Sequence, residues 1–282
     1  PTQIGSFTGP VSRNTGLNAN LGGSFSPIIA TSGVITGTLR LGALTYNLSG
    51  RLDSSAMGNP TASILVKRVF PYSNLTINFT VDTANQALTG GTITDGINHA
   101  SFTGWRKKWG TVMTQPEKDD LNRYLGRYTF ALKAPAGQPT RPQGSGWGSF
   151  TVAPLTGALT ASGRLADHTL FTSSTFAGPN GEILVYQPLY SNRGSIVGTL
   201  DMAQGSAGFT PPYGDNTLSG TVSWLRPDIS GRLYPAGFGP YDLTAVGGRY
   251  VAPTPASTIV MGIIDDLSSN NASLTFTGAD RS

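Results

Sequence analysis

Two tryptophans and three cations lie in one short stretch of the chain and could form a binding site. The stretch GWRKKWG contains Trp105, Arg106, Lys107, Lys108 and Trp109. Tryptophan faces stack on sugar rings and attract cations, and basic side chains hold anionic surfaces. Residues four apart in a strand share one face, so Trp105 and Trp109 are expected to form a common platform. The stretch is therefore a candidate site for a glycan or an anionic partner.

The same residues also have a structural interpretation, which the sequence favours. Trp105 would end a strand and plug the mouth of a β unit, and Trp224 in VSWLRP would do the same in a second unit. Each tryptophan is followed closely by a cation, Arg106 or Arg226. This recurrence favours a structural role over a binding role.

A further tryptophan, Trp147, lies in the glycine-rich stretch QGSGWGSF. A phosphate-binding loop needs a helix directly after its glycines, and a nucleoside-triphosphate loop ends in Gly-Lys-Ser/Thr. The residues that follow here, SFTVAP, have neither feature and suit an extended segment. We therefore expect these glycines to open a strand, and we keep Trp147 as a binding candidate.

The sequence lacks the patterns of common catalytic and metal sites. It has no cysteine, and its two histidines, His99 and His168, lie far apart in turn-like contexts. Neither a G-x-S-x-G nucleophile elbow nor an H-E-x-x-H zinc motif occurs. The 15 acidic residues lie mostly in turns, and no two of them stand out as the carboxyl pair of a glycosidase. We expect no enzymatic activity, no metal and no cofactor.

The composition is that of strands joined by turns. Only 12% of the residues are charged, whereas 37 are glycine and 19 are proline. Thr, Ser, Val and Ile, which favour strands, recur throughout the chain. The net charge of +4 is modest, and we expect no nucleic-acid partner. No apolar run reaches the roughly 18 residues of a membrane-spanning helix, so no transmembrane segment is expected.

The chain repeats itself. The segment 23–46, which begins GSFSPII, resembles the segment 148–171, which begins GSFTVAP, and NPTASILV at 59–66 resembles PNGEILV at 179–185. A third opening, GRYVAP, starts at Gly248. A period above about 100 residues indicates duplicated domains rather than a solenoid.

The repeat divides the chain into predicted units. We expect β repeat units over 1–110 and 126–228, a helical linker over 111–125, and a partial third unit or strand-donating tail over 229–282. In the linker, TQPEKDDLNRYLG has the start and stop signals of a helix over about 116–124.

Within each unit the pattern predicts antiparallel strands. Apolar and polar residues alternate in LTINFTV at 75–81, and turn signals return about every 8–12 residues, as in a meander. Glycine repeatedly follows Thr or Ser, and such glycines let a sheet bend and close; the pairs end at Gly37, Gly50, Gly104, Gly163, Gly220 and Gly278. The sequence therefore predicts an all-β fold of two tandem antiparallel meander barrels or curled sandwiches with one short linking helix.

Several stretches together resemble β-rich tandem repeat regions of large secreted or cell-surface proteins of Gram-negative bacteria, of the immunoglobulin-like or autotransporter-associated type. They are GWRKKW, GSGWGSFTV, TGALTASGRLADHT and FAGPNGEILVYQPLYSNRGSIVGTL, and the resemblance is strongest over 101–225. It implies an extracellular or outer cell-surface location after removal of a signal peptide, and a modular, non-catalytic role.

These observations favour an extracellular structural or adhesive β module that assembles or binds at the cell surface. Its partners would be other protein subunits, copies of itself or surface glycans. One alternative is a carbohydrate-binding module that uses Trp105, Trp109 and Trp147 as exposed platforms. A second alternative is an accessory subunit of an envelope protein complex.

Overall fold

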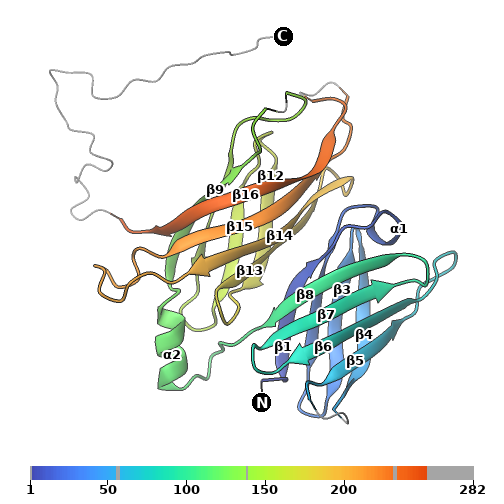
Figure 1. The fold of residues 1–282 in the computed structure, drawn as a ribbon, viewed down its shortest axis with the longest axis horizontal. Coiled ribbons are helices and arrows are strands. Elements are labelled where there is room, and N and C mark those ends of the chain that lie inside the picture. The colour runs from blue at the N-terminus through green and yellow to red at the C-terminus, as the bar shows by residue number, and fades with distance from the viewer. Residues whose placement is uncertain (1, 55–57, 138, 231–233, 253–282) are drawn as a thin grey trace.

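The computed structural model describes residues 2–54, 58–137, 139–230 and 234–252. This part of the chain is all-β and forms two eight-stranded antiparallel sheets joined by a segment with a short helix (Figure 1). One sheet is a closed barrel, and the other is nearly closed. The predicted fold class is thereby confirmed, in its barrel form.

The first barrel closes by pairing its first strand with its last. Its elements are β1 (Gly5–Val11), α1 (Thr15–Asn18), β2 (Gly23–Ile29), β3 (Val34–Leu41), β4 (Leu44–Asp53), β5 (Thr61–Val66), β6 (Leu75–Asp82), β7 (Ala87–Thr94) and β8 (His99–Arg106). Each strand pairs with the next, and β1 meets β8 with Phe7 opposite Arg106 and Val11 opposite Phe102. Closure leaves no free sheet edge.

The second sheet repeats this meander. Its strands are β9 (Gly126–Lys133), β10 (Gly146–Val152), β11 (Ala158–Arg164), β12 (Leu170–Phe176), β13 (Glu182–Leu189), β14 (Gly194–Ala203), β15 (Thr217–Arg226) and β16 (Phe238–Tyr250). β16 pairs back onto β9, but no backbone ladder joins β12 to β13 in the described chain. We call this gap between the fourth and fifth strands of the unit the seam.

The equivalent junction of the first barrel is also weakly paired. Between β4 and β5 only Leu52 with Ala62 and Asp53 with Thr61 are in register. The other neighbouring strands of that barrel share longer ladders, such as the run from Thr61 to Val66 between β5 and β6. The fourth and fifth strands are therefore the loosest contact in both repeats.

Alternating apolar side chains build the cores. In β6, Leu75, Ile77 and Val81 are fully buried, as the alternating pattern predicts. Aromatic rings fill the centre of the first barrel, where the ring centroids of Phe25 and Phe102 lie 4.4 Å apart. Each barrel has its own core, so each repeat is a domain-like unit.

Glycines within the strands allow neighbouring backbones to approach closely. Gly37 has a φ of +122°, and a Cβ there would lie 2.2 Å from the carbonyl oxygen of Ser26 on β2. At Gly163 a Cβ would lie 2.0 Å from the carbonyl oxygen of Trp147 on β10. Both positions belong to the recurring Thr/Ser-Gly pattern, so larger residues there are excluded by backbone contact.

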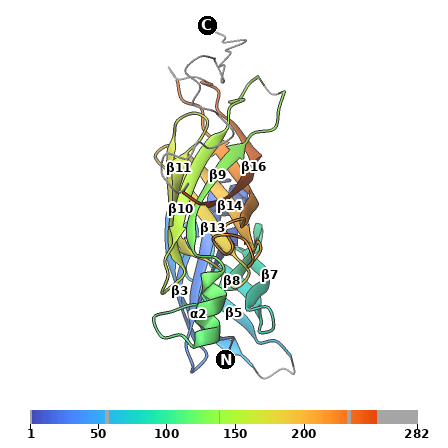
Figure 2. The ribbon, with the colours of Figure 1, turned by 90° about the vertical axis from the view of Figure 1, so that its left-hand side faces the viewer.

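The segment between the barrels carries a short helix that lies below the second barrel in Figure 2, and side chains of this segment pack into the second core. Helix α2 (Gln115–Asn122) coincides closely with the helix predicted at 116–124, and the backbone N–H of Thr114 donates to Glu117 Oε2 at 2.8 Å in a capping box. Leu121 and Tyr124 belong to the second core together with Trp109, whose ring centroid lies 5.7 Å from that of Tyr124. The predicted linker is therefore part of the second barrel.

Strand β16 corrects the predicted limit of the second unit at 228. The segment 229–282 was expected to be a partial third unit or a strand-donating tail, but β16 completes the second barrel by pairing with β15 and β9. The stretch GRY at Gly248 lies antiparallel to the GRY at Gly126, with Tyr250 opposite Arg127. The rest of that predicted unit, 253–282, lies outside the described residues.

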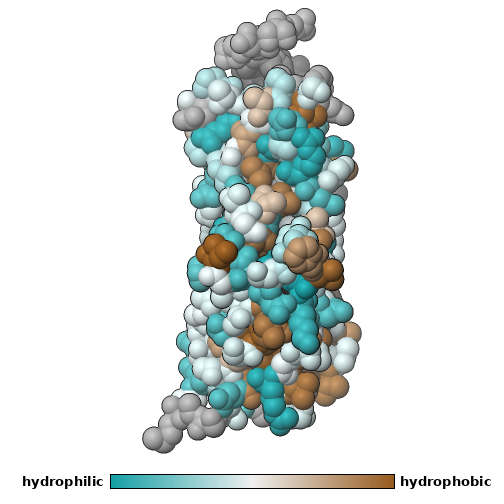
Figure 3. All heavy atoms as spheres, turned by 90° about the vertical axis from the view of Figure 1, so that its right-hand side faces the viewer, coloured by the Kyte–Doolittle hydropathy of each residue, from teal (hydrophilic) through white to brown (hydrophobic). Residues whose placement is uncertain are grey.

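The face of the molecule in Figure 3 mixes hydrophilic and hydrophobic patches. Among the most exposed apolar side chains are Phe70, Ile97 and Val112, which lie in loops. No described helix is long and apolar enough to cross a membrane.

Candidate binding cleft between the barrels

The outer face of the first barrel presents two rows of polar side chains to the second barrel. In the first row, Ser26 of β2 lies opposite Thr38 of β3, and its Oγ lies 3.2 Å from Oγ1 of Thr8 on β1. In the next row, Ser24 lies opposite Arg40. These residues alternate with buried core residues, so all five side chains point outward from the same three strands.

The facing wall is the seam of the second barrel. Ser173 of β12 bridges it, because its Oγ donates to the carbonyl oxygen of Leu184 at 3.1 Å and accepts from the backbone N–H of Tyr186 at 3.1 Å. Gln187 Oε1 accepts a hydrogen bond from the backbone N–H of Thr172. Side chains thus hold β12 to β13 where a backbone ladder is missing, and they leave polar groups along the seam.

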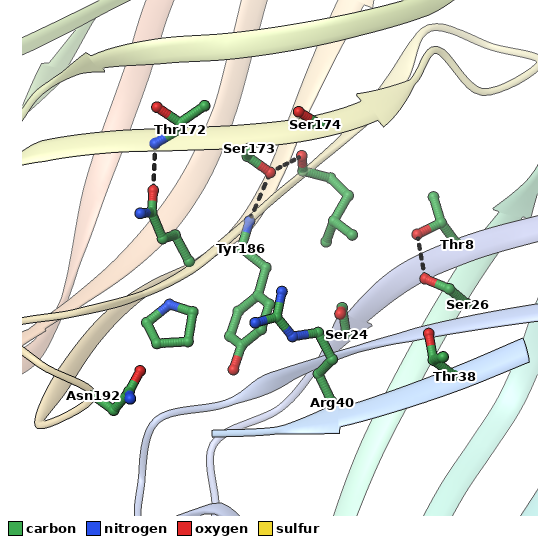
Figure 4. A pocket seen from close by; sticks show the side chains of 13 residues that line it. Thr8, Ser24, Ser26, Thr38, Arg40, Thr172, Ser173, Ser174, Tyr186 and Asn192 are labelled. Carbon is green, nitrogen blue, oxygen red and sulfur yellow. Dashed lines mark hydrogen bonds between the residues drawn. The ribbon is translucent and has the colours of Figure 1, made fainter. Parts of the chain in front are cut away.

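A cleft of about 490 Å³ lies between these two walls (Figure 4). Its lining is rich in hydroxyl and amide groups, which come from Thr8, Ser24, Ser26, Thr38, Thr172, Ser173, Ser174, Tyr186, Gln187 and Asn192. Leu184 and Pro188 add apolar surface. Arg40 is the only charged side chain among the described residues of the lining. The cleft therefore suits a ligand with many hydrogen-bonding groups.

Tyr186 connects the two walls. Its hydroxyl donates to the carbonyl oxygen of Gly42 in the first barrel at 2.8 Å, and the guanidinium carbon of Arg40 lies 5.8 Å from the centroid of its ring. Burial raises the pKa of Tyr186 to about 12, although the nearby Arg40 and Arg13 oppose this rise. The phenol therefore stays protonated at neutral pH and keeps its contact with the first barrel.

Arg13 joins the barrels elsewhere in their interface. Its Nη1 donates to Ser195 Oγ at 2.6 Å, and its Nη2 and Nε donate to O and Oγ of Ser223 at 2.7 and 3.0 Å. A further bond from Nη1 to the carbonyl oxygen of Asn20, at 2.6 Å, fixes the guanidinium within its own barrel. Burial lowers the pKa of Arg13 to about 10, which leaves the group charged at neutral pH. The cleft walls are thus held in a defined arrangement.

Trp105 lies in the interface rather than on the surface. It is only 5% exposed and packs in an apolar cluster with Leu184, Tyr186 and Val197 of the second barrel. It is not part of the first core, so it does not plug the first barrel as expected. Trp224 does lie in the core of its barrel, where its Nε1 donates to the hydroxyl of Tyr190 at 3.0 Å.

The predicted platform of Trp105 and Trp109 is not formed. Trp109 is 1% exposed and lies beyond the end of β8 at Arg106, so the two tryptophans do not share a strand face. One ring packs between the barrels and the other lies within the second core. The expectation failed because the strand ends between them.

The cations Arg106, Lys107 and Lys108 of the GWRKKWG stretch make contacts with other parts of the chain. Arg106 Nη1 donates to Gln86 Oε1 at 3.0 Å, and Lys108 Nζ lies 2.6 Å from Asp120 Oδ2 of α2. The backbone N–H of Lys107 donates to the carbonyl oxygen of Ser6 at 2.7 Å, which extends the pairing of β8 with β1 by one residue. The side chains of Arg106 and Lys108 are therefore engaged within the molecule.

Trp147 is the predicted site residue that remains accessible. It is 57% exposed on β10, where it lies opposite Arg164 of β11 and Ala131 of β9. It does not line the cleft. Trp147 is therefore a separate aromatic surface, and the structure does not bring it together with Trp105 or Trp109.

The residues of the cleft were missed at the level of the sequence, because single Ser and Thr side chains at outward positions are common in any Thr-rich sheet. Arg40 offered the one usable signal. It places a charge at an outward position of the alternating stretch VITGTLRLG, in a chain where only 12% of residues are charged. The residues of the facing wall, such as Tyr186, lie more than a hundred positions from Arg40 in the chain, and no local pattern indicates them.

The fold and the cleft define a class of protein with two tandem eight-stranded barrels and a hydroxyl-lined cleft between them. No protein-family model, curated protein or solved structure matches the chain. Among the described residues, no group of three or more His, Asp or Glu side chains is placed to hold a metal ion.

Proposed function

We propose that this chain is a non-catalytic binding module of the cell surface that holds a saccharide in the cleft between its two barrels. The observation that carries the proposal is the lining of the cleft, in which hydroxyl and amide groups from both barrels converge. Such groups both donate and accept hydrogen bonds, as the hydroxyls of a sugar do. A few convergent polar groups in a concave site are what fixes the orientation of a small ligand.

The support of the walls favours recognition by a preformed site. Arg13 and Tyr186 each hydrogen-bond across the interface, and Trp105 packs against the second barrel next to Tyr186. A site that is already ordered loses less conformational entropy on binding. A low entropy cost of binding is important for saccharides, because each sugar hydroxyl loses its hydrogen bonds to water when the sugar binds.

The non-catalytic part of the proposal rests on the chemistry of the lining. Hydrolysis of a glycosidic bond generally needs two carboxyl groups that flank it. The described residues of the cleft include no Asp, Glu or His. The cleft can therefore hold a sugar, and it offers no acid and base for cleaving one.

The cell-surface and adhesive parts of the proposal rest on the resemblance to repeat regions of secreted and surface proteins. A rigid pair of barrels with a polar cleft suits a module that attaches to surface glycans. In the alternative, a carbohydrate-binding module with exposed tryptophan platforms, Trp147 is the remaining platform, since Trp105 and Trp109 are buried.

A glycan array with matched cleft variants tests the proposal. Thr38→Tyr places a ring in the cleft, and Thr36→Tyr places the same ring two positions away on the same outward face of β3, outside the cleft. We expect wild type and Thr36→Tyr to bind the same glycans and Thr38→Tyr to lose them. If Trp147→Ala abolishes binding while Thr38→Tyr retains it, the site is the tryptophan surface and the cleft proposal is wrong.

A further inference from the structure

Arg40 stands out within the cleft because no acidic side chain in the described part of the chain pairs with it. It is exposed on the outward face of β3. All other described lining residues are neutral. A charge held at the wall of a neutral, hydroxyl-lined cleft creates a preference for a ligand of opposite sign.

Tyr186 positions this cation. The hydroxyl of Tyr186 is fixed by its bond to the Gly42 carbonyl, and the Arg40 guanidinium carbon lies 5.8 Å from the ring centroid (Figure 4). A cation–π contact uses the ring's face and does not consume the N–H donors of the guanidinium. Those donors stay available in a fork that matches a planar carboxylate.

The neighbours of Arg40 complete a site for a charged sugar. Ser24 lies opposite Arg40 in the β2–β3 ladder, and Ser26 and Thr38 follow in the next row. Thr172 and Ser174 line the facing wall from β12 of the second barrel. Ser173 lies between them, but its hydroxyl is already bonded to Leu184 and Tyr186. A sugar ring seated between the two rows would find hydroxyl partners, and a carboxylate on that ring would reach the guanidinium without meeting a like charge.

We propose that the cleft selects acidic saccharides, in which a ring carboxylate binds Arg40 and the sugar hydroxyls bind the surrounding Ser and Thr side chains. This inference rests on the proposed function, since it specifies the ligand class of the same cleft. The inference predicts in addition that a neutral sugar binds more weakly than an acidic sugar of the same shape.

Isothermal titration with two matched probes tests this selectivity. The probes are an oligogalacturonate and the same oligosaccharide with its carboxyl groups reduced to neutral alcohols. We expect the acidic probe to bind about tenfold more tightly, as a charge-assisted hydrogen bond contributes. Arg40→Gln should remove this difference and leave the affinity for the neutral probe unchanged. Arg51→Gln removes an exposed cation of β4 outside the cleft and should change neither affinity.

The outcomes separate the two proposals. If the neutral probe binds as tightly as the acidic one and both are lost in Thr38→Tyr, the cleft binds saccharides and the role of Arg40 is wrong. If Arg51→Gln weakens acidic binding as much as Arg40→Gln, the preference comes from net charge and the inference also fails. If neither probe binds wild type, both proposals are contradicted. A sulfated oligosaccharide bound more tightly than the carboxylated one would contradict recognition of a carboxylate.

Discussion

Arg13 and Ser195 lie 182 positions apart in the chain, yet the guanidinium of Arg13 donates to both Oγ and the backbone oxygen of Ser195, at 2.6 and 3.3 Å. Ser195 is fully buried. This contact makes the two barrels one structural unit, and it holds in place the walls that form the cleft.

Arg13→Gln is therefore expected to destabilise the protein by about 2–3 kcal/mol, because it leaves the buried acceptors of Ser195 and the half-buried acceptors of Ser223 without their donor. Urea denaturation of wild type, Arg13→Gln and the exposed control Arg51→Gln measures this. Equal stability of the two variants would show that the contact does not hold the barrels together.

The seam yields a prediction for local stability. Ser173→Ala removes the hydroxyl that joins Leu184 and Tyr186 to β12, so buried backbone groups lose a partner at a cost of about 1–3 kcal/mol. Ser174→Ala is the matched control, since Ser174 points outward on the same strand. Hydrogen exchange at the Tyr186 amide should become faster in Ser173→Ala only. Unchanged exchange would mean that the seam is held by other contacts.

Trp109 and Trp147 should differ sharply in their contribution to stability. Trp109→Ala empties a packed site beside Leu121 and Tyr124 and should cost about 3–5 kcal/mol. Trp147→Ala changes an exposed strand position and should change stability by no more than about 0.5 kcal/mol. Thermal or urea unfolding compares the two directly, and a small effect at Trp109 would argue against its role in the second core.

Buried phenols predict a loss of stability at alkaline pH. Burial raises the pKa of Tyr186 from 10.0 to about 12, and it also raises the pKa of Tyr190 and Tyr241. A folded-state pKa above the unfolded value means that the folded protein holds its proton more tightly. The contribution of Tyr186 is thus complete below about pH 10 and is lost as the pH rises towards 12.

Tyr186→Phe should therefore show a smaller fall in unfolding free energy than wild type between about pH 10 and pH 12. Its stability at neutral pH should be lower by about 1 kcal/mol, because the bond to Gly42 is gone. Tyr72→Phe, at an exposed loop position, is the control and should follow wild type at every pH. Parallel curves for Tyr186→Phe and wild type would contradict the assigned environment.

The sequence predicted those features that depend on local pattern. The alternation in 75–81 is found in β6, the glycines at Gly37 and Gly163 are required by close backbone approach, and α2 begins at its capping signals. Each of these follows from sterics or hydrogen bonding between near neighbours, which a single stretch of residues records.

What depends on long-range pairing could not be predicted in this way. β16 was assigned elsewhere because its GRY stretch resembles the start of β9, whereas the two stretches pair with each other. Trp105 was expected to be exposed or to plug its barrel, but its partners Leu184 and Val197 come from the second repeat. The cleft also combines residues from both repeats, so its composition appears only after the barrels are docked.

Chemical-shift mapping can locate a bound saccharide in the cleft between the barrels residue by residue. A ¹⁵N-labelled sample titrated with oligogalacturonate should show its largest amide shifts at Ser26, Thr38 and Tyr186, which line the cleft from both barrels. Shifts confined to the neighbours of Trp147, such as Ala131 and Arg164, or the absence of any shift, would contradict the proposed saccharide site in the cleft.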